Sequence, residues 1–310
     1  MSKSATSVGT WRSSTTPAAI PPDGGTPSAR QRRERSACPW GLGQRMEARA
    51  QDLLETVDYY HAVFTLPEPL GPVALQNKRV VYGLLFRSVA ETLQTIAKDP
   101  KHLGAEIGFL AILHTWGQRL NHHAHLHCVI PGGGLSFDEQ RWIPCRKNFF
   151  LPVRVLSALF QGKFLSYLKE AVQKGKVSFH GQLQSLADEN NWKRFLRSLR
   201  QGDWVVYTKP PFGGAHHVLK YLARYTHRVA ISNQRLLSLQ NGNVRFSWKD
   251  YRNGNKQRTM TLDAVEFLRR FLLHVLPNGF MRIRYYGFLA NPAYGGKREA
   301  RPVPAALGPC

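Results

Sequence analysis

The chain has little cysteine and no long apolar run. Its four cysteines are scattered over 310 residues, and no two of them form a C-x-x-C pair of the kind found in zinc ribbons and redox sites. Nowhere do about 18 apolar residues follow one another, the length that spans a bilayer, and the first residues lack the apolar core of a secretory signal. The sequence therefore predicts neither disulfides nor a membrane span, and a reducing cytoplasm is the expected location.

Acidic residues are scarce as well. Lys and Arg number 43 against 20 Asp and Glu, which gives a formal net charge of +23. Most of this excess lies after residue 49, so the basic character belongs to the body of the chain and not to one tail. A surplus of this size predicts a polyanionic partner, with nucleic acid as the first candidate.

Three regions differ in composition. Residues 1–47 are rich in Ser, Thr, Pro, Gly and Arg without periodicity, which predicts a disordered basic tail. Residues 48–291 show strand-like and helix-like patterns and form the predicted folded domain, and residues 292–310 form a second disordered tail. Strands are predicted at 61–67, 106–114, 125–130, 204–208, 236–239, 244–248 and 280–288, and helices at 74–96, 153–174, 192–200, 215–230 and 262–276.

Histidines gather in one predicted strand. His125 and His127 alternate in an extended segment, so their side chains fall on one face, and a neighbouring antiparallel strand can bring His114 beside them. Three neutral imidazoles with an open coordination position can hold a divalent ion that polarises a phosphoryl oxygen. These three histidines are therefore the candidate metal ligands. The weaker candidates near the site are His122, His123 and Gln118.

The helix predicted at 215–230 carries two tyrosines. Tyr221 and Tyr225 are four residues apart, which places them on one side of the helix. Tyr225 falls in the apolar stripe and is the better candidate for a core aromatic, whereas Tyr221 borders the polar stripe that holds Arg224 and Arg228. Arginines can bridge phosphates in bidentate fashion, so the polar stripe suits a phosphate substrate.

Tyrosines beside a metal site suit a transesterification on DNA. A phenol with a pKa near 10 is ionised in only about one molecule in a thousand at pH 7, a deficit of roughly 4 kcal/mol. A metal ion on the scissile phosphate can offset this deficit. The phenol would then attack the phosphorus, a covalent phosphotyrosine would form, and the other strand end would leave as a hydroxyl. Two tyrosines would allow two such exchanges.

At these residues the sequence resembles a known family. His125-Leu-His127 with the Cys-Val-Ile-Pro-Gly-Gly-Gly-Leu-Ser that follows it, and the stretch from Tyr221 to Ser232, are similar to the two-tyrosine rolling-circle transposases of bacterial insertion sequences. These transposases are members of the HUH endonuclease superfamily. The likeness runs from residue 58 to residue 291 and includes the stretches around Lys209 and Lys249.

The resemblance implies a fold, a cofactor and a substrate. The expected fold is α+β, an antiparallel ferredoxin- or RRM-like sheet with packed helices and the histidines on central strands. The expected cofactor is Mg²⁺ or Mn²⁺, bound by His125 and His127, with His114 as the third ligand by likeness to conjugative relaxases. The expected substrate is single-stranded DNA, which the tyrosines nick while they retain its 5′ end. The residues expected to contact DNA are Arg224, Arg228, Lys209 and Lys249.

Both ends of the chain depart from the family pattern. Such transposases usually begin with a cysteine-rich zinc-binding segment, whereas the region before residue 58 holds only Cys38. After Asn291 the expected basic, cysteine-bearing tail is replaced by a divergent sequence. We therefore expect a rearranged, frameshifted or mis-started copy with an intact catalytic body.

Two other functions fit parts of the sequence. The run His123-Ala-His125-Leu-His127 matches the histidine-triad pattern of nucleotide hydrolases, although that function gives no role to the tyrosine pair or to the charge. The second alternative is a non-catalytic DNA-binding protein, the remnant of a transposase, that uses only its basic surface.

Overall fold

The computed structural model describes residues 57–146, 150–209 and 230–290. All of them belong to one compact unit, Gln44–Cys310. The tails predicted at 1–47 and 292–310 lie outside the described residues, as does nearly all of the helix predicted at 215–230. Among the described helices, none has the length and apolarity needed to cross a membrane.

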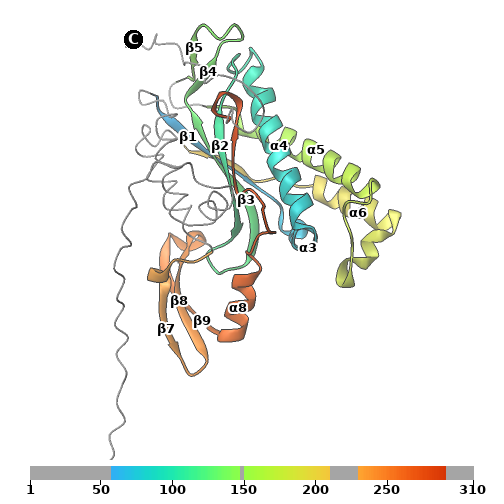
Figure 1. Ribbon diagram of the computed structural model, residues 1–310, viewed down its shortest axis with the longest axis vertical. Helices are drawn as coiled ribbons and strands as arrows, with labels where there is room; N and C mark the ends of the chain where they lie inside the picture. Colours follow the sequence, from blue (N-terminus) through green and yellow to red (C-terminus); the bar gives the residue numbers. More distant parts are fainter. Residues whose placement is uncertain (1–56, 147–149, 210–229, 291–310) are drawn as a thin grey trace, which may run out of the picture. The chain divides into compact units, whose positions relative to one another are not determined.

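The centre of this unit is an antiparallel sheet of five strands (Figure 1). Their order across the sheet is β10-β2-β3-β1-β6, so β2, β3 and β1 are interior strands. β2 and β3 are consecutive and pair as a hairpin. The bounds are β1 (Tyr59–Thr65), β2 (Phe109–Trp116), β3 (His122–Pro131), β6 (Val206–Lys209) and β10 (Ile283–Tyr286).

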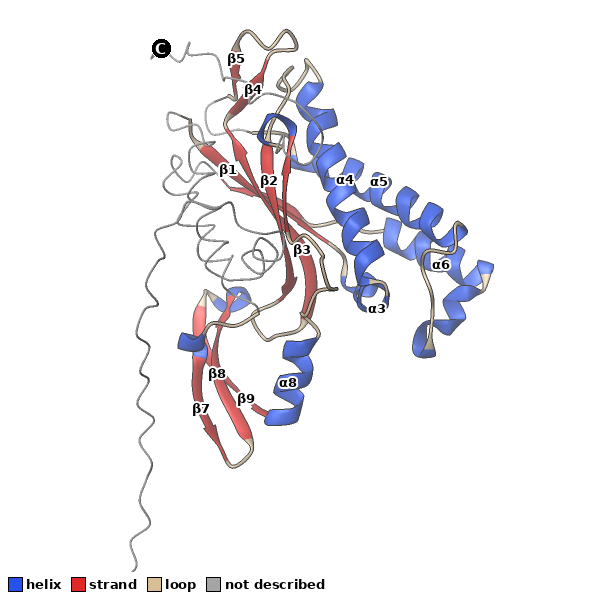
Figure 2. Cartoon of the chain, viewed as in Figure 1, coloured by secondary structure: helices blue, strands red, loops and turns tan. Residues whose placement is uncertain are grey.

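Helices pack on one face of this sheet (Figure 2). Apart from the edge strand β10, the sheet has four strands, in the order β2-β3-β1-β6. Along the chain these strands and the helices that pack on them follow the order strand, helix, strand, strand, helix, strand. This is the ferredoxin-like arrangement, so the predicted α+β fold is confirmed. The helices are α3 (Gly71–Gln76), α4 (Lys78–Lys98), α5 (Val153–Gln173) and α6 (Glu189–Arg200), and a small separate hairpin pairs β4 (Gly133–Leu135) with β5 (Trp142–Pro144).

Alternation along β3 separates the two faces of the sheet. Ala124, Leu126 and Cys128 are buried in the main hydrophobic core together with side chains of α4 and α5. Because successive side chains of a strand point to opposite sides, His125 and His127 lie on the other face. The core thus occupies the helical side and leaves the histidines on the opposite side.

Residues 230–276 form a smaller sheet and a helix, which we call the C-terminal module. Its three strands are antiparallel, and Phe246 of the central strand packs with Phe267 and Phe271 of the helix. Asn241 and Gly242, between the first two strands, have φ angles of 50° and 71°, as a type I′ hairpin requires. The bounds are β7 (Leu236–Gln240), β8 (Asn243–Asp250), β9 (Lys256–Asp263) and α8 (Ala264–Leu272).

The prediction of one continuous helix at 74–96 is wrong, because the structure has two helices there, α3 and α4. Asn77, with φ −121° and ψ 41°, separates α3 from α4. Its side-chain amide pairs with the backbone of Ser178, whose N–H donates to Oδ1 and whose carbonyl accepts from Nδ2, both at 2.9 Å. A contact with a residue far along the chain therefore interrupts a helix that the local pattern continues.

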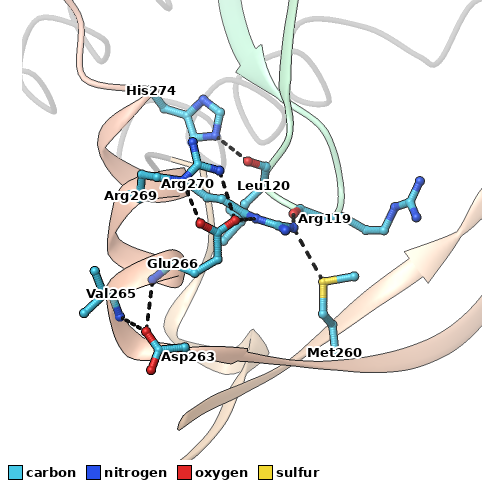
Figure 3. A network of polar contacts seen from close by, with 9 residues as sticks. All are labelled: Arg119, Leu120, Met260, Asp263, Val265, Glu266, Arg269, Arg270 and His274. Carbon is cyan, nitrogen blue, oxygen red and sulfur yellow. Dashed lines mark hydrogen bonds and ion pairs between the residues drawn. The ribbon is translucent and has the colours of Figure 1, made fainter. Parts of the chain in front are cut away.

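The helix predicted at 262–276 also differs. Its first two residues belong to β9, a strand that the sequence analysis did not predict. Asp263 ends this strand and caps α8, because its Oδ1 accepts the backbone N–H groups of Val265 at 2.8 Å and Glu266 at 3.4 Å (Figure 3). An N-cap of this kind satisfies donors that have no partner inside the helix.

His274, just after α8, should make the stability of the fold sensitive to acid. It is buried between Leu120, whose carbonyl accepts from Nε2, and Thr115, whose hydroxyl lies 3.3 Å from Nδ1. Burial lowers the pKa of His274 from 6.5 to about 4. The unfolded chain therefore takes up the proton first, and stability is lost as the pH falls from 6.5 towards 4, by up to about 3 kcal/mol for this group.

Denaturant unfolding at pH 7, 5.5 and 4 measures this loss. In His274→Gln, which keeps hydrogen-bonding capacity without a titrating ring, the decline in unfolding free energy between pH 6.5 and 4 should be smaller. Equal declines in the two proteins would contradict the assignment to His274.

Candidate metal centre

Histidines from three strands share the face of the sheet opposite the helices, where His123 on β3 joins the four described next. His125 and His127 lie on β3, His114 on β2 and His61 on β1. His114 is the direct antiparallel partner of His125, as the spacing predicted. His61 lies diagonally across from His127, whose direct partner on β1 is Val63. Three adjacent strands therefore contribute imidazoles to one patch.

His114, His125 and His127 form the compact part of this patch. Their ring centroids are 4.1 Å apart for His114 and His127, 4.8 Å for His125 and His127, and 5.3 Å for His114 and His125. One ligand nitrogen from each ring lies within 4.8 Å of the other two. Within the described ranges, this is the group of His, Cys, Asp or Glu side chains that can hold a metal ion. The structure thus brings together the three candidate ligands taken from the sequence.

Hydrogen bonds orient two of these rings. His125 Nδ1 donates to the carbonyl of His123 at 2.7 Å, which places the proton on Nδ1 and a lone pair on Nε2. His127 Nδ1 lies 2.8 Å from Nε2 of His61, and the two rings stack with centroids 5.0 Å apart. In both rings Nδ1 is engaged and Nε2 is the candidate ligand atom, which is the usual arrangement of metal-binding histidines.

His61 is the functional candidate that the sequence analysis missed. Its predicted strand was correct, but its contact with His127 joins residues 66 positions apart and depends on the register between β1 and β3. The available signal was the position of His61 in a predicted strand, because a strand that pairs with the strand of His125 and His127 can present its own histidine on the same face. Pairing alone decides whether it does.

Burial keeps these imidazoles neutral. Loss of hydration lowers the pKa of His61 to about 4 and that of His125 to about 3. The same cause places the pKa values of His114 and His127 well below 6.5, and neighbouring histidines act in the same direction. At neutral pH all four rings therefore have the uncharged form, which is the form that binds metal ions.

The other sequence candidates occupy different places. Lys209, at the end of β6, is exposed and directly opposite His61 in the register, so it borders the histidine patch. His122 has its Nε2 2.9 Å from the hydroxyl of Tyr82 on α4, on the helical side of the sheet. Lys249 lies on β8, in the C-terminal module, and both polar atoms of the Gln118 side chain bond to the same module, at Lys249 and Tyr251.

The remaining sequence candidates come from the helix predicted at 215–230. Tyr221, Tyr225, Arg224 and Arg228 lie outside the described residues.

Lys209 and Ala230, the residues on either side of 210–229, are both described. Lys209 precedes this range, opposite His61. Ala230 follows it and is buried with Leu120, in the loop that joins β2 to β3. Of these two described residues, Lys209 therefore lies next to β1 and Ala230 next to the loop between β2 and β3.

Comparison with known proteins identifies the family. The model of a family described as putative transposase, Y2_Tnp, matches residues 108–296. The chain belongs to this family. The stretch matched by the Y2_Tnp model contains His114, His125 and His127 as well as both tyrosines, and the predicted resemblance is confirmed.

Two curated relatives extend the Y2_Tnp match. The putative transposase y4qJ of Sinorhizobium fredii (strain NBRC 101917 / NGR234) is 60% identical over 248 residues, which are 80% of this chain and 62% of the relative. The transposase for insertion sequence element IS801 of Pseudomonas savastanoi pv. phaseolicola is 32% identical over 239 residues, 76% of this chain and 55% of the relative. The matched region thus spans somewhat more than half the length of these relatives.

Proposed function

We propose that this protein is a transposase that nicks and rejoins single-stranded DNA, with the histidine cluster as its metal centre and Tyr221 and Tyr225 as its nucleophiles. The observation that carries the proposal is the cluster of His114, His125 and His127 on one face of a ferredoxin-like sheet. Membership of a putative transposase family and the net charge of +23 support DNA as the substrate.

The donor set fits a divalent ion. All three candidate ligands are neutral imidazoles, and the Nδ1 bonds of His125 and His127 hold their rings in place. Mg²⁺ prefers oxygen ligands, so an all-imidazole set favours Mn²⁺ of the two expected ions. The chemistry that a bound ion supplies is polarisation of a phosphoryl oxygen of the scissile phosphate.

The chain's own residues supply the rest of the reaction. In this proposal Lys209, which is exposed and opposite His61 in the register, contacts the DNA backbone. The hydroxyl of Tyr221 or Tyr225 attacks the phosphorus, the bond from phosphorus to the 3′ oxygen breaks, and the proton leaves with the 3′ hydroxyl. A DNA hydroxyl that attacks the phosphotyrosine reverses the step and joins a new strand end.

An oligonucleotide labelled at its 3′ end tests this proposal. With Mn²⁺ we expect an adduct that carries the label and survives denaturation, and the same oligonucleotide labelled at its 5′ end should release a free fragment. Chelation should abolish both products. DNA retention without an adduct under every condition would contradict nicking and favour a DNA-binding remnant. Hydrolysis of small nucleotides that is insensitive to chelation would favour the histidine-triad function.

His61 should act as a positioning residue for His127. Because its ring nitrogen holds His127 Nδ1 at 2.8 Å, His61→Ala is expected to weaken Mn²⁺ binding by about 10- to 100-fold, the loss typical of outer partners of metal ligands. His61→Gln, whose amide can also accept from His127, should recover part of the affinity. Calorimetric titration with Mn²⁺ measures both variants. Native affinity in His61→Ala would contradict the role.

A further inference from the structure

The loop between β2 and β3, residues 117–121, is held by the C-terminal module (Figure 3). Arg270 Nη1 donates to the carbonyl of Arg119 at 3.4 Å, and His274 Nε2 donates to the carbonyl of Leu120 at 3.3 Å. The loop joins the two strands that carry the candidate metal ligands. These contacts therefore link the C-terminal module to the strands that carry the histidines.

Gln118 connects this loop to the end of β8. Its Oε1 accepts the backbone N–H of Lys249 at 3.2 Å, and its Nε2 donates to the hydroxyl of Tyr251 at 3.3 Å. Its own carbonyl accepts the guanidinium of Arg235. The amide that the sequence offered as a weak metal ligand thus fixes the start of a short 3₁₀ helix, η4 (Tyr251–Asn253).

The ring of Tyr251 is presented to solvent beside positive charge. Tyr251 is 64% exposed although its hydroxyl is held by Gln118. Lys249 Nζ lies 5.7 Å from its ring centroid. An exposed aromatic ring and a cation therefore lie together at the end of β8.

The acidic residue in this stretch does not cancel that charge. Asp250 is buried, and its carboxylate pairs with Arg258 at 3.0 Å and accepts from Asn253 at 2.8 Å. An exposed ring with a cation over it is a combination that suits single-stranded nucleic acid, because bases stack on aromatic rings and phosphates contact cations.

We propose that Tyr251 is a stacking platform for one nucleobase of single-stranded DNA, with Lys249 contacting a neighbouring phosphate. The proposal rests on the proposed function in that the strand bound here continues to the histidine cluster. Gln118 is its positioning residue, since it ties the platform to the loop between the ligand-bearing strands. Stacking tolerates every base, so the platform holds the strand without selecting its sequence.

Fluorescence anisotropy with a labelled oligonucleotide tests the platform, with a chelator present so that no cleavage occurs. Tyr251→Ala should weaken binding by about 5- to 150-fold, the range expected for one base stacked on an aromatic side chain. Tyr251→Phe keeps the ring but loses the hydroxyl that Gln118 holds, so it should retain most of the affinity that Tyr251→Ala loses. An oligonucleotide with abasic sites should bind equally to the unmodified protein and to Tyr251→Ala. Lys249→Ala should reduce the salt dependence of binding by about one phosphate contact.

Phe137→Ala is the matched control. Phe137 is 59% exposed, close to the value for Tyr251, but it lies between β4 and β5 and is followed directly by Asp138 and Glu139. Its removal should leave DNA affinity unchanged. Unchanged affinity in Tyr251→Ala, or an equal loss with the abasic oligonucleotide, would overturn the platform.

The DNA-binding assay of the Tyr251 variants and the adduct assay test the two proposals independently. A stacking loss at Tyr251 without any adduct would support the platform and refute nicking. An adduct that forms while Tyr251→Ala binds DNA normally would refute the platform and leave nicking intact.

Discussion

His127→Ala is expected to abolish both Mn²⁺ binding and adduct formation. His127 is the ring nearest to His114, at 4.1 Å between centroids, and its orientation is set by His61. Loss of an outer partner of a metal ligand typically weakens metal binding by about 10- to 100-fold. Loss of the ligand itself should weaken metal binding further. Mn²⁺ binding should therefore fall by more than about 100-fold, measured by calorimetric titration, and no labelled adduct should appear on a denaturing gel.

The matched control is His123→Ala, on the same strand face. Its ring centroid lies 5.1 Å from that of His125, but the structure assigns only its backbone carbonyl to the site, as acceptor for His125 Nδ1. This variant should bind Mn²⁺ and form the adduct as the unmodified protein does. Native Mn²⁺ affinity in His127→Ala, with a folded protein confirmed by circular dichroism, would contradict the metal centre.

The double substitution Tyr221→Phe and Tyr225→Phe should remove the adduct completely. Phenylalanine keeps the ring but lacks the hydroxyl, so no oxygen is left at either position to attack the phosphorus. DNA affinity and Mn²⁺ affinity should stay near their native values, because neither depends on the phenol oxygens. The single variants, compared on the same gel, show which hydroxyl attacks first.

Tyr207→Phe provides the control for this substitution. Tyr207 lies on β6 and is 51% exposed, with Lys209 Nζ 5.9 Å from its ring centroid, so it is a tyrosine near the site that the proposal does not use. Its variant should form the adduct normally. An adduct of native yield in the double variant would show that another residue is the nucleophile.

The histidine cluster was predictable because its signal is local. Alternation fixes His125 and His127 on one face within a single strand, and a short connection makes the strand of His114 its natural neighbour. His61 was not predictable in this way. Its position beside His127 requires β1 to pair with β3 in one particular register, which is set by packing of the whole sheet.

Most strands and helices followed from periodicity, and the misses have identifiable causes. In β9, Met260 and Leu262 are partly buried while most of their neighbours are exposed and polar, so the apolar pattern is short. The break at Asn77 comes from its bonds to Ser178, a contact between distant residues. Gln118 was a plausible ligand by position, but its partners Lys249 and Tyr251 lie more than a hundred residues later.

Anomalous X-ray scattering from Mn²⁺-soaked crystals of the full chain tests the central claim most directly. The proposal predicts one strong peak between the imidazoles of His114, His125 and His127, absent from crystals of His127→Ala and retained in His123→Ala. A saturating soak that gives no peak at this cluster, or a peak only elsewhere on the surface, would contradict the assignment of these three histidines as the metal centre.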